Sequence, residues 1–189
     1  MLRDLVIKNR SYRRFYQDVP VSLETLRELV DLARLSPSGR NAQPLRYILC
    51  NEPEKNALIF KHLAWAGSIK DWPGPVEGER PSAYIIILGD HETSPTFGCN
   101  HGIASQSILL GAAEKGLGGC NIGSIQRPSL QAALQIPSRY EILLVLALGK
   151  PKETVVLEEV GPDGSTTYYR DEAQVHHVPK LALDDIILG

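Results

Sequence analysis

The chain has 189 residues, of which 43% are hydrophobic and 22% charged, and its formal net charge is −2. This length suits one compact domain over residues 1–189, and the hydrophobic share is sufficient for a core. A nearly neutral chain without a basic or acidic tail argues against nucleic acid or an anionic membrane as the main partner. The longest apolar runs, residues 83–88 and 142–148, are too short to span a bilayer. Because charges interrupt the apolar residues at the N-terminus, we expect no signal peptide and a cytoplasmic protein.

The cysteines and histidines predict neither disulfides nor a metal site. Cys50, Cys99 and Cys120 are odd in number and contain no Cys-x-x-Cys pair, which favours buried or half-buried free thiols over a disulfide framework or an iron–sulfur site. His176 and His177 are adjacent, so their side chains diverge on a strand as well as on a helix. That spacing does not suit a shared metal ion.

The first half of the chain predicts three helices, one strand and a long loop. Apolar spacing, a capping Ser22 and the positions of glycine and proline give the following order: helix 2–9, helix 22–35, strand 45–50, helix 52–64 and loop 67–81. Trp72 lies in this loop, which is long enough to act as a mobile flap.

The second half predicts two buried strands and a tail. The expected order is strand 83–88, helix 100–115, a short helix starting at Pro128, and strand 142–148. Residues 155–169 contain Pro162-Asp163-Gly164 and are typical of a hairpin or a turn excursion. Residues 181–188 form a short apolar helix or strand that needs a packing partner. Helices around a small sheet indicate an α+β or α/β sandwich.

Three segments carry candidate chemistry. The first is NRSYRRF at residues 9–15, whose three arginines and serine can donate to a phosphate or another oxyanion, although a basic cluster beside a helix is more often a solvated face. The second is SPSGRNAQP at residues 36–44, whose small and amide side chains suit the edge of a flat heteroaromatic ring or an ordinary turn.

The third segment is the glycine run GLGGCNIGS at residues 116–124. It is not a dinucleotide-binding fingerprint, because the glycines follow an expected helix rather than a strand and form no G-x-G-x-x-G. Gly116 or Gly118 is expected to cap the helix. The loop that follows has a backbone that can approach a ligand closely.

Taken together, these segments resemble the nitroreductase family of FMN enzymes. Four family patterns occur in order and cover most of the chain: NRSYRRF at 9–15, PSGRNAQP at 37–44, NHGIASQ at 100–106 followed by GLG at 116–118, and PKL at 179–181. The family commonly has a basic residue at the positions of Asn9 and Leu181 and an aspartate at Asn100. The resemblance implies an α+β fold, namely a three-layer α/β/α sandwich with a small, mainly antiparallel sheet surrounded by helices. It also implies an intertwined homodimer in which a C-terminal arm, residues 155–189, packs on the partner subunit.

The resemblance assigns the ligand-binding roles. Arg10, Ser11 and Lys180 would bind the FMN phosphate, and Arg13 would lie near the N1/O2 edge of the flavin. From the partner subunit, the loop would contribute Pro37, Ser38, Gly39, Asn41 and Gln43. The backbone of Gly123 and Ser124 would face N5 and O4. Trp72 would cover the substrate face or, alternatively, act as a local packing anchor.

The implied activity is an FMN-dependent oxidoreductase in which NADH or NADPH reduces the flavin and a nitroaromatic, quinone or related small-molecule acceptor reoxidises it in a ping-pong cycle. Catalysis would be carried by FMN rather than by a protein acid or base, in keeping with the lack of a G-x-S-x-G nucleophile motif. Two alternatives remain: an FMN-dependent dehalogenase or flavin-degrading relative, and a non-enzymatic flavin carrier.

Overall fold

The computed structural model describes residues 1–69 and 71–189. Its elements follow in this order: α1 (Leu2–Lys8), β1 (Phe15–Tyr16), α2 (Leu23–Leu35), the 3₁₀ turn η1 (Gly39–Asn41), β2 (Leu45–Cys50), α3 (Pro53–Phe60), β3 (Ala83–Asp90), α4 (Asn100–Glu114), β4 (Gly118–Ile122), α5 (Arg127–Ala133), β5 (Tyr140–Pro151), β6 (Val155–Glu159), β7 (Tyr169–Arg170), β8 (His176–Lys180) and α6 (Leu183–Ile186). Within the described part of the chain, no helix is both long enough and apolar enough to cross a membrane.

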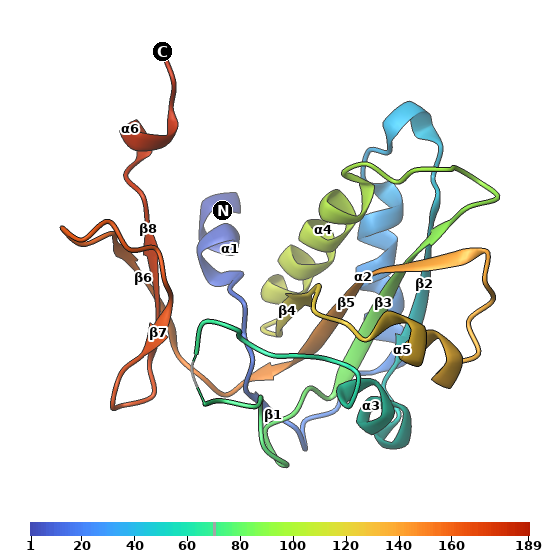
Figure 1. The fold of residues 1–189 in the computed structure, drawn as a ribbon, viewed down its shortest axis with the longest axis horizontal. Helices are drawn as coiled ribbons and strands as arrows, with labels where there is room; N and C mark the ends of the chain where they lie inside the picture. The colour runs from blue at the N-terminus through green and yellow to red at the C-terminus, as the bar shows by residue number, and fades with distance from the viewer. Residues whose placement is uncertain (70) are drawn as a thin grey trace.

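A five-stranded antiparallel sheet forms the centre of the molecule (Figure 1). Its longest strand, β5, pairs with β1, β3 and β4, and β2 pairs with the far side of β3. All eight residues of β3 are buried, as the uninterrupted apolar run predicts. The sheet therefore needs cover on both faces.

Helices provide this cover in two layers. Ile85 and Ile87 of β3 pack on one face with residues of α2 and α4, which lie side by side in Figure 1. Tyr84 and Ile86 point to the other face and pack with residues of α3 and α5. The period of two along the strand thus separates two cores. The predicted three-layer sandwich with a mainly antiparallel sheet is confirmed.

Several local predictions are also confirmed. The backbone N–H of Thr25 donates to the side-chain oxygen of Ser22 at 3.0 Å, so Ser22 caps α2. Proline is found in the first turn of α5. All three cysteines are free thiols, and Cys50 and Cys120 are buried as predicted, but Cys99 is exposed rather than buried or half-buried.

The glycine run corrects one prediction. Gly116 has a φ of +70° and ends α4, as expected. The residues after it do not form a loop, because Gly118–Ile122 is β4, paired with β5. A Cβ on Gly119 would lie 2.7 Å from the carbonyl oxygen of Ala147 and 2.6 Å from Leu109. Glycine is required at this position for close packing between β4, β5 and α4.

The tail and α3 correct two further predictions. The helix expected over 52–64 ends at Phe60. Of the two alternatives for residues 155–169, the hairpin is wrong, because β6 pairs in parallel with β8 and β7 pairs antiparallel with the same strand. The turn excursion is present, since the N–H of Gly164 donates to the carbonyl oxygen of Gly161 at 3.0 Å. This small sheet stands beside α1, apart from the central sheet (Figure 1). The apolar segment at 181–188 contains only the single turn of α6, which has no buried residue.

We predict that Gly119→Ala destabilises the fold by about 1–3 kcal/mol, because the new methyl group meets backbone that cannot move without disturbing the sheet. Gly123→Ala is the matched control, since nothing lies within 4 Å of a Cβ there. Chemical unfolding of both variants measures the effect. Equal stability of the two variants would show that β4 does not pack this tightly.

Candidate functional site

The arginine-rich segment at residues 9–15 lies along β4. The backbone N–H of Tyr12 donates to the carbonyl oxygen of Gly119 at 3.0 Å, and Ser11 forms a β-bridge with the same glycine. The buried Glu153 holds the segment from the other side, because its carboxylate accepts the backbone N–H groups of Arg13 and Arg14. The backbone of the segment is therefore fixed. The side chain of Arg14 is engaged by Glu79.

Residues from both ends of the chain line one cavity of about 320 Å³, here called the arginine cavity. Its lining includes Arg10, Ser11, Arg13 and Lys180. Lys180 ends β8, and Figure 1 shows this strand beside α1. The structure thus brings together the four residues to which the family resemblance gives roles at the phosphate and at the flavin edge.

Arg10 has one nitrogen in need of a partner. Its Nη2 donates to the carbonyl oxygen of Val6 at 2.7 Å, whereas its Nε is buried and has no hydrogen-bond partner. Burial also lowers the pKa of Arg10. A half-buried guanidinium whose buried Nε–H has no partner is stabilised by an anionic acceptor. The donors of this cavity therefore suit a phosphate group.

Arg13 contacts two arm residues that the sequence analysis did not select. Its Nη1 lies 3.3 Å from His176 Nε2, and its guanidinium lies 4.9 Å from the centre of the Tyr168 ring. Because arginine can only donate, His176 Nε2 must accept and Nδ1 must carry the proton. Burial, reinforced by Arg13 and Arg170, lowers the pKa of His176 to about 4. His176 is therefore neutral at pH 7.

Glu153 also anchors the arm. It accepts a hydrogen bond from Arg170 Nη2 at 2.9 Å, and the side chains of this pair are 0% and 7% exposed. The guanidinium of Arg170 lies over the Trp72 ring, 4.2 Å from its centre. Trp72 is partly buried against the core, so its contacts support the alternative of a packing anchor. Lys70, in the same loop, lies outside the described residues.

A second, smaller cavity continues from the first. It has a volume of about 160 Å³, contains Gly123 and Ser124 just after β4, and is here called the glycine cavity. Arg13, Asn121 and Tyr168 line both cavities. The space at Gly123 is open, and the carbonyl oxygen of Ser124 accepts the N–H of Ala64 at 2.9 Å. The two cavities therefore meet at Arg13.

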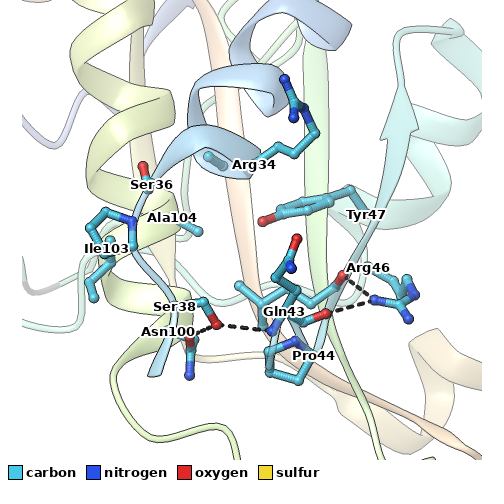
Figure 2. Close-up of a pocket in the computed structure, with 13 residues that line it drawn as sticks. Arg34, Ser36, Ser38, Gln43, Pro44, Arg46, Tyr47, Asn100, Ile103 and Ala104 are labelled. Carbon is cyan, nitrogen blue, oxygen red and sulfur yellow. Dashed lines mark hydrogen bonds between the residues drawn. The ribbon is translucent and has the colours of Figure 1, made fainter. Parts of the chain in front are cut away.

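Within one chain, the loop at 36–44 lies apart from the arginine and glycine cavities. Ser38 Oγ donates to Asn100 Oδ1 at 2.8 Å and accepts the backbone N–H of Gln43 at 3.0 Å (Figure 2). The N–H of Gly39 also donates to Asn100 Oδ1, so Asn100 joins the loop to the start of α4. Pro37, Ser38 and Gln43 line a cavity of about 220 Å³ here.

The backbone of this loop is unusual. Asn41 and Gln43 have φ values of +54° and +49°, in the left-handed region that non-glycine residues seldom adopt. Among the described residues, none from 36–44 lines the arginine or the glycine cavity. The chain by itself therefore does not unite the loop with the other predicted site residues.

Comparison with known proteins gives the family. The model of the nitroreductase family matches residues 7–150. The chain belongs to the nitroreductase family. The matched residues include β1 to β4, α2 to α5 and all of β5 except Pro151, whereas the arm lies beyond them.

This nitroreductase-family chain is similar to enzymes that carry out different reactions. It is 26% identical over 170 residues to an iodotyrosine deiodinase from Thermotoga neapolitana, covering 81% of this chain and 90% of the relative. It is 22% identical over 205 residues to a chloronitrobenzene nitroreductase from Comamonas testosteroni, with coverage of 83% and 90%. Oxidoreductase activity is supported, and the substrate is left open.

Solved structures agree with the fold. A nitroreductase family protein from Streptococcus pneumoniae TIGR4 matches with a TM-score of 0.72 and 17% identity, covering 100% of both chains. An FMN-dependent nitroreductase from Clostridium difficile R20291 matches with a TM-score of 0.64 and 24% identity, covering 79% of this chain and 87% of the other.

We predict that the pKa values of the two adjacent histidines are shifted in opposite directions. His176 should titrate near pH 4, whereas His177, which bonds to Asp171 at 3.1 Å and Glu158 at 2.9 Å, has its pKa raised above the ordinary 6.5. Between pH 6.5 and 4 the unfolded chain protonates His176 and the folded chain does not, so this residue lowers stability as the pH falls. His177 instead stabilises the fold below pH 6.5, and this contribution is lost as the pH rises through its raised pKa.

NMR titration of the imidazole signals measures both values in one sample. Since the raised pKa of His177 depends on Asp171 and Glu158, its signal also reports whether the arm stays folded during the titration. Titration of His176 near 6.5 would contradict its burial beside Arg13.

Proposed function

We propose that this chain is an FMN-dependent oxidoreductase in which NADH or NADPH reduces the flavin and a nitroaromatic, quinone or related small molecule accepts the electrons. The observation that carries the proposal is the convergence of Arg10, Ser11 and Lys180 on one cavity, next to a second cavity at Gly123. The similarity to a chloronitrobenzene nitroreductase and to an FMN-dependent nitroreductase structure supports it.

The residues present suit FMN. Arg10 and Lys180 would neutralise the phosphate, with Ser11 as a further donor, because a dianion is best bound by charge-assisted hydrogen bonds. Arg13, positioned through its backbone by Glu153, would place a positive charge at the ring edge. Gly123 and Ser124 offer backbone groups without a bulky side chain. When bound, FMN supplies hydride transfer, and the protein contributes orientation and electrostatics.

A homodimer would complete the site. The loop at 36–44 lies away from the two cavities within one chain, and the partner subunit's Ser38, Asn41 and Gln43 would supply the missing contacts to the ring. The arm leaves large apolar side chains exposed, namely Leu181, Leu183, Ile186, Ile187 and Leu188. Exposed apolar surface of this kind is typical of an interface. We propose that the end of the arm packs on the second subunit.

Reductive dehalogenation is the second candidate function, supported by the similarity to an iodotyrosine deiodinase. A flavin carrier without turnover is the third possibility. Anaerobic mixing of the flavin-loaded protein with NADH or NADPH separates them. Prompt bleaching followed by steady turnover with menadione supports the reductase, bleaching only with another donor favours the dehalogenase, and no turnover with any acceptor favours the carrier.

Removing one phosphate contact should weaken FMN binding selectively. We expect Lys180→Ala to lower the affinity for FMN about tenfold and to leave the affinity for riboflavin unchanged, because riboflavin lacks the phosphate. Lys61→Ala, which removes an exposed lysine that lines neither cavity, is the control. Equal losses for FMN and riboflavin would contradict the assigned role of Lys180.

Mixed dimers test the proposal that two subunits share a site. One variant carries Arg10→Ala with Lys180→Ala, and the other carries Ser38→Ala with Gln43→Ala. If each site takes its phosphate contacts from one subunit and its loop from the other, each homodimer is defective, but the mixed dimer regains one intact site of two.

Coexpression with two affinity tags provides the mixed dimer, and bound flavin and menadione turnover are measured per dimer. Recovery to about half of the wild-type value is expected. No recovery would contradict a shared site, because every site would then carry one of the defects.

A further inference from the structure

Two side chains of the arm contact the guanidinium of Arg13. Its Nη1 lies 3.3 Å from His176 Nε2, and its Cζ lies 4.9 Å from the centre of the Tyr168 ring, within the range of a cation–π contact. The two rings also contact each other, with their centres 5.2 Å apart. Both residues lie beyond the segment that matches the family model, residues 7–150. The arm therefore adds contacts to Arg13 from outside the matched segment.

The backbone of His176 is fixed at the centre of the small sheet. Because β8 lies between β6 and β7, His176 pairs with Val155 on one side and with Arg170 on the other. Its N–H also donates to the carbonyl oxygen of Thr154 at 2.9 Å, and the residue is only 1% exposed. A buried side chain on a strand that is paired on both sides has little freedom. Its ring can therefore hold a neighbouring group in one place.

The hydrogen bonds of Arg13 define what His176 provides. Nη1 carries two hydrogens, and its two neighbouring acceptors are the carbonyl oxygen of Ser11 at 3.2 Å and His176 Nε2. Because arginine cannot accept, the imidazole accepts in its neutral form. Burial, together with Arg13 and Arg170, lowers the pKa of His176 to about 4, so the ring has this form at pH 7. Nη1 is thereby used, which leaves Nε and Nη2 of Arg13 for other partners.

Arg13 is located where a fixed cation would matter. It lines both the arginine cavity and the glycine cavity, as does Tyr168, whereas His176 lines the arginine cavity. A cation stabilises developing charge most when it is already in place, because no reorganisation is then needed. A long arginine side chain has many rotamers when it is unrestrained. The contacts with His176 and Tyr168 restrict this freedom before a ligand binds.

We propose that His176 is a positioning residue that, together with Tyr168, holds the Arg13 guanidinium at the edge of the flavin ring and so raises the reduction potential of bound FMN. The proposal rests on the proposed function and deepens the role given there to Arg13. Reduction increases the negative charge on the flavin ring, and a fixed cation at its edge stabilises that charge. An Arg13 released from His176 would stabilise it less, so the potential would fall.

Two variants of similar size separate hydrogen bonding from packing. His176→Gln keeps a neutral acceptor that can reach Arg13, whereas His176→Leu has none. On the FMN-loaded protein at pH 7, we expect His176→Leu to lower the preference for reduced over oxidised FMN about three- to tenfold, which is a fall of about 15–30 mV in the midpoint potential of a two-electron couple. His176→Gln should stay within about twofold of wild type, since it restores the bond to a charged donor.

A double-mutant cycle shows whether His176 acts through Arg13. Arg13→Gln removes the cation, so adding His176→Leu to it should shift the potential no further. His177→Gln is the matched control, because this adjacent residue of the same strand has its ring nitrogens 2.9 Å from Glu158 and 3.1 Å from Asp171. It alters the arm without touching Arg13 and should leave the potential unchanged.

Tyr168 provides a second pair of variants should His176→Leu not fold. Tyr168→Phe keeps the ring face beside Arg13 and loses only the hydroxyl, which accepts the N–H of Ser68 at 3.4 Å. Tyr168→Leu removes the ring face as well. Only Tyr168→Leu should lower the potential, because the cation–π contact depends on the ring.

Two results would overturn the proposal. The first is an equal potential in wild type, His176→Leu and Tyr168→Leu. The second is a further fall when His176→Leu is added to Arg13→Gln, because His176 would then act through the structure of the arm alone.

Failure of the proposed function gives a different result. A folded wild-type protein that binds no FMN removes the flavin role, and crystal structures of the ligand-free variants then decide the positioning of Arg13. Its guanidinium should keep its place in His176→Gln and leave it in His176→Leu. The same position in both variants would show that His176 does not hold it.

Discussion

The buried carboxylate of Glu153 is the interaction on which the site depends. It accepts the backbone N–H groups of Arg13 and Arg14 and pairs with Arg170, so it joins the N-terminal segment to the arm. Through the stacking of Arg170 on Trp72 it also reaches the long loop. Removing one member of such a buried ion pair leaves an uncompensated charge, which destabilises the contact between the N-terminal segment and the arm. Glu153 therefore links both ends of the chain at the arginine cavity.

The charged residues around the arginine cavity explain why it suits an anion. Arg10, Arg13 and Lys180 line it, while the only buried carboxylate nearby, among the described residues, is already engaged by Arg170. His176 stays neutral because burial and two guanidinium groups oppose its protonation. A neutral imidazole can accept from Arg13, which a charged one could not. The result is a positive cavity with a fixed arginine and a free guanidinium N–H, which an anion would complete.

The layers of the fold were predictable from local pattern, whereas several pairings were not. The apolar runs at 83–88 and 142–148 identified the two central strands, because buried strands are continuously apolar. β4 escaped prediction since Gly118 and Gly119 have low strand propensity and form a strand only through contact with β5. The parallel pairing of β6 with β8 joins residues 21 positions apart, such as Val155 and His176, and leaves no short-range signal.

The candidate site was likewise predicted only in part. Arg10, Ser11 and Lys180 were selected by resemblance to a family, and the structure places them in one cavity. Glu153 and His176 were missed because they act through tertiary contacts. Glu153 stands in an unremarkable polar stretch, and the pair His176-His177 was considered only for metal spacing. The loop residues Ser38, Asn41 and Gln43 were also selected by resemblance, and their role depends on a second subunit.

A crystal structure of the protein grown with FMN is the most direct test of the central claim. We expect the phosphate within hydrogen-bonding distance of Arg10, Ser11 and Lys180, with the ring running past Arg13 towards Gly123. A phosphate bound elsewhere, or an arginine cavity that excludes FMN because Tyr168 and His176 fill it, would contradict the proposed function.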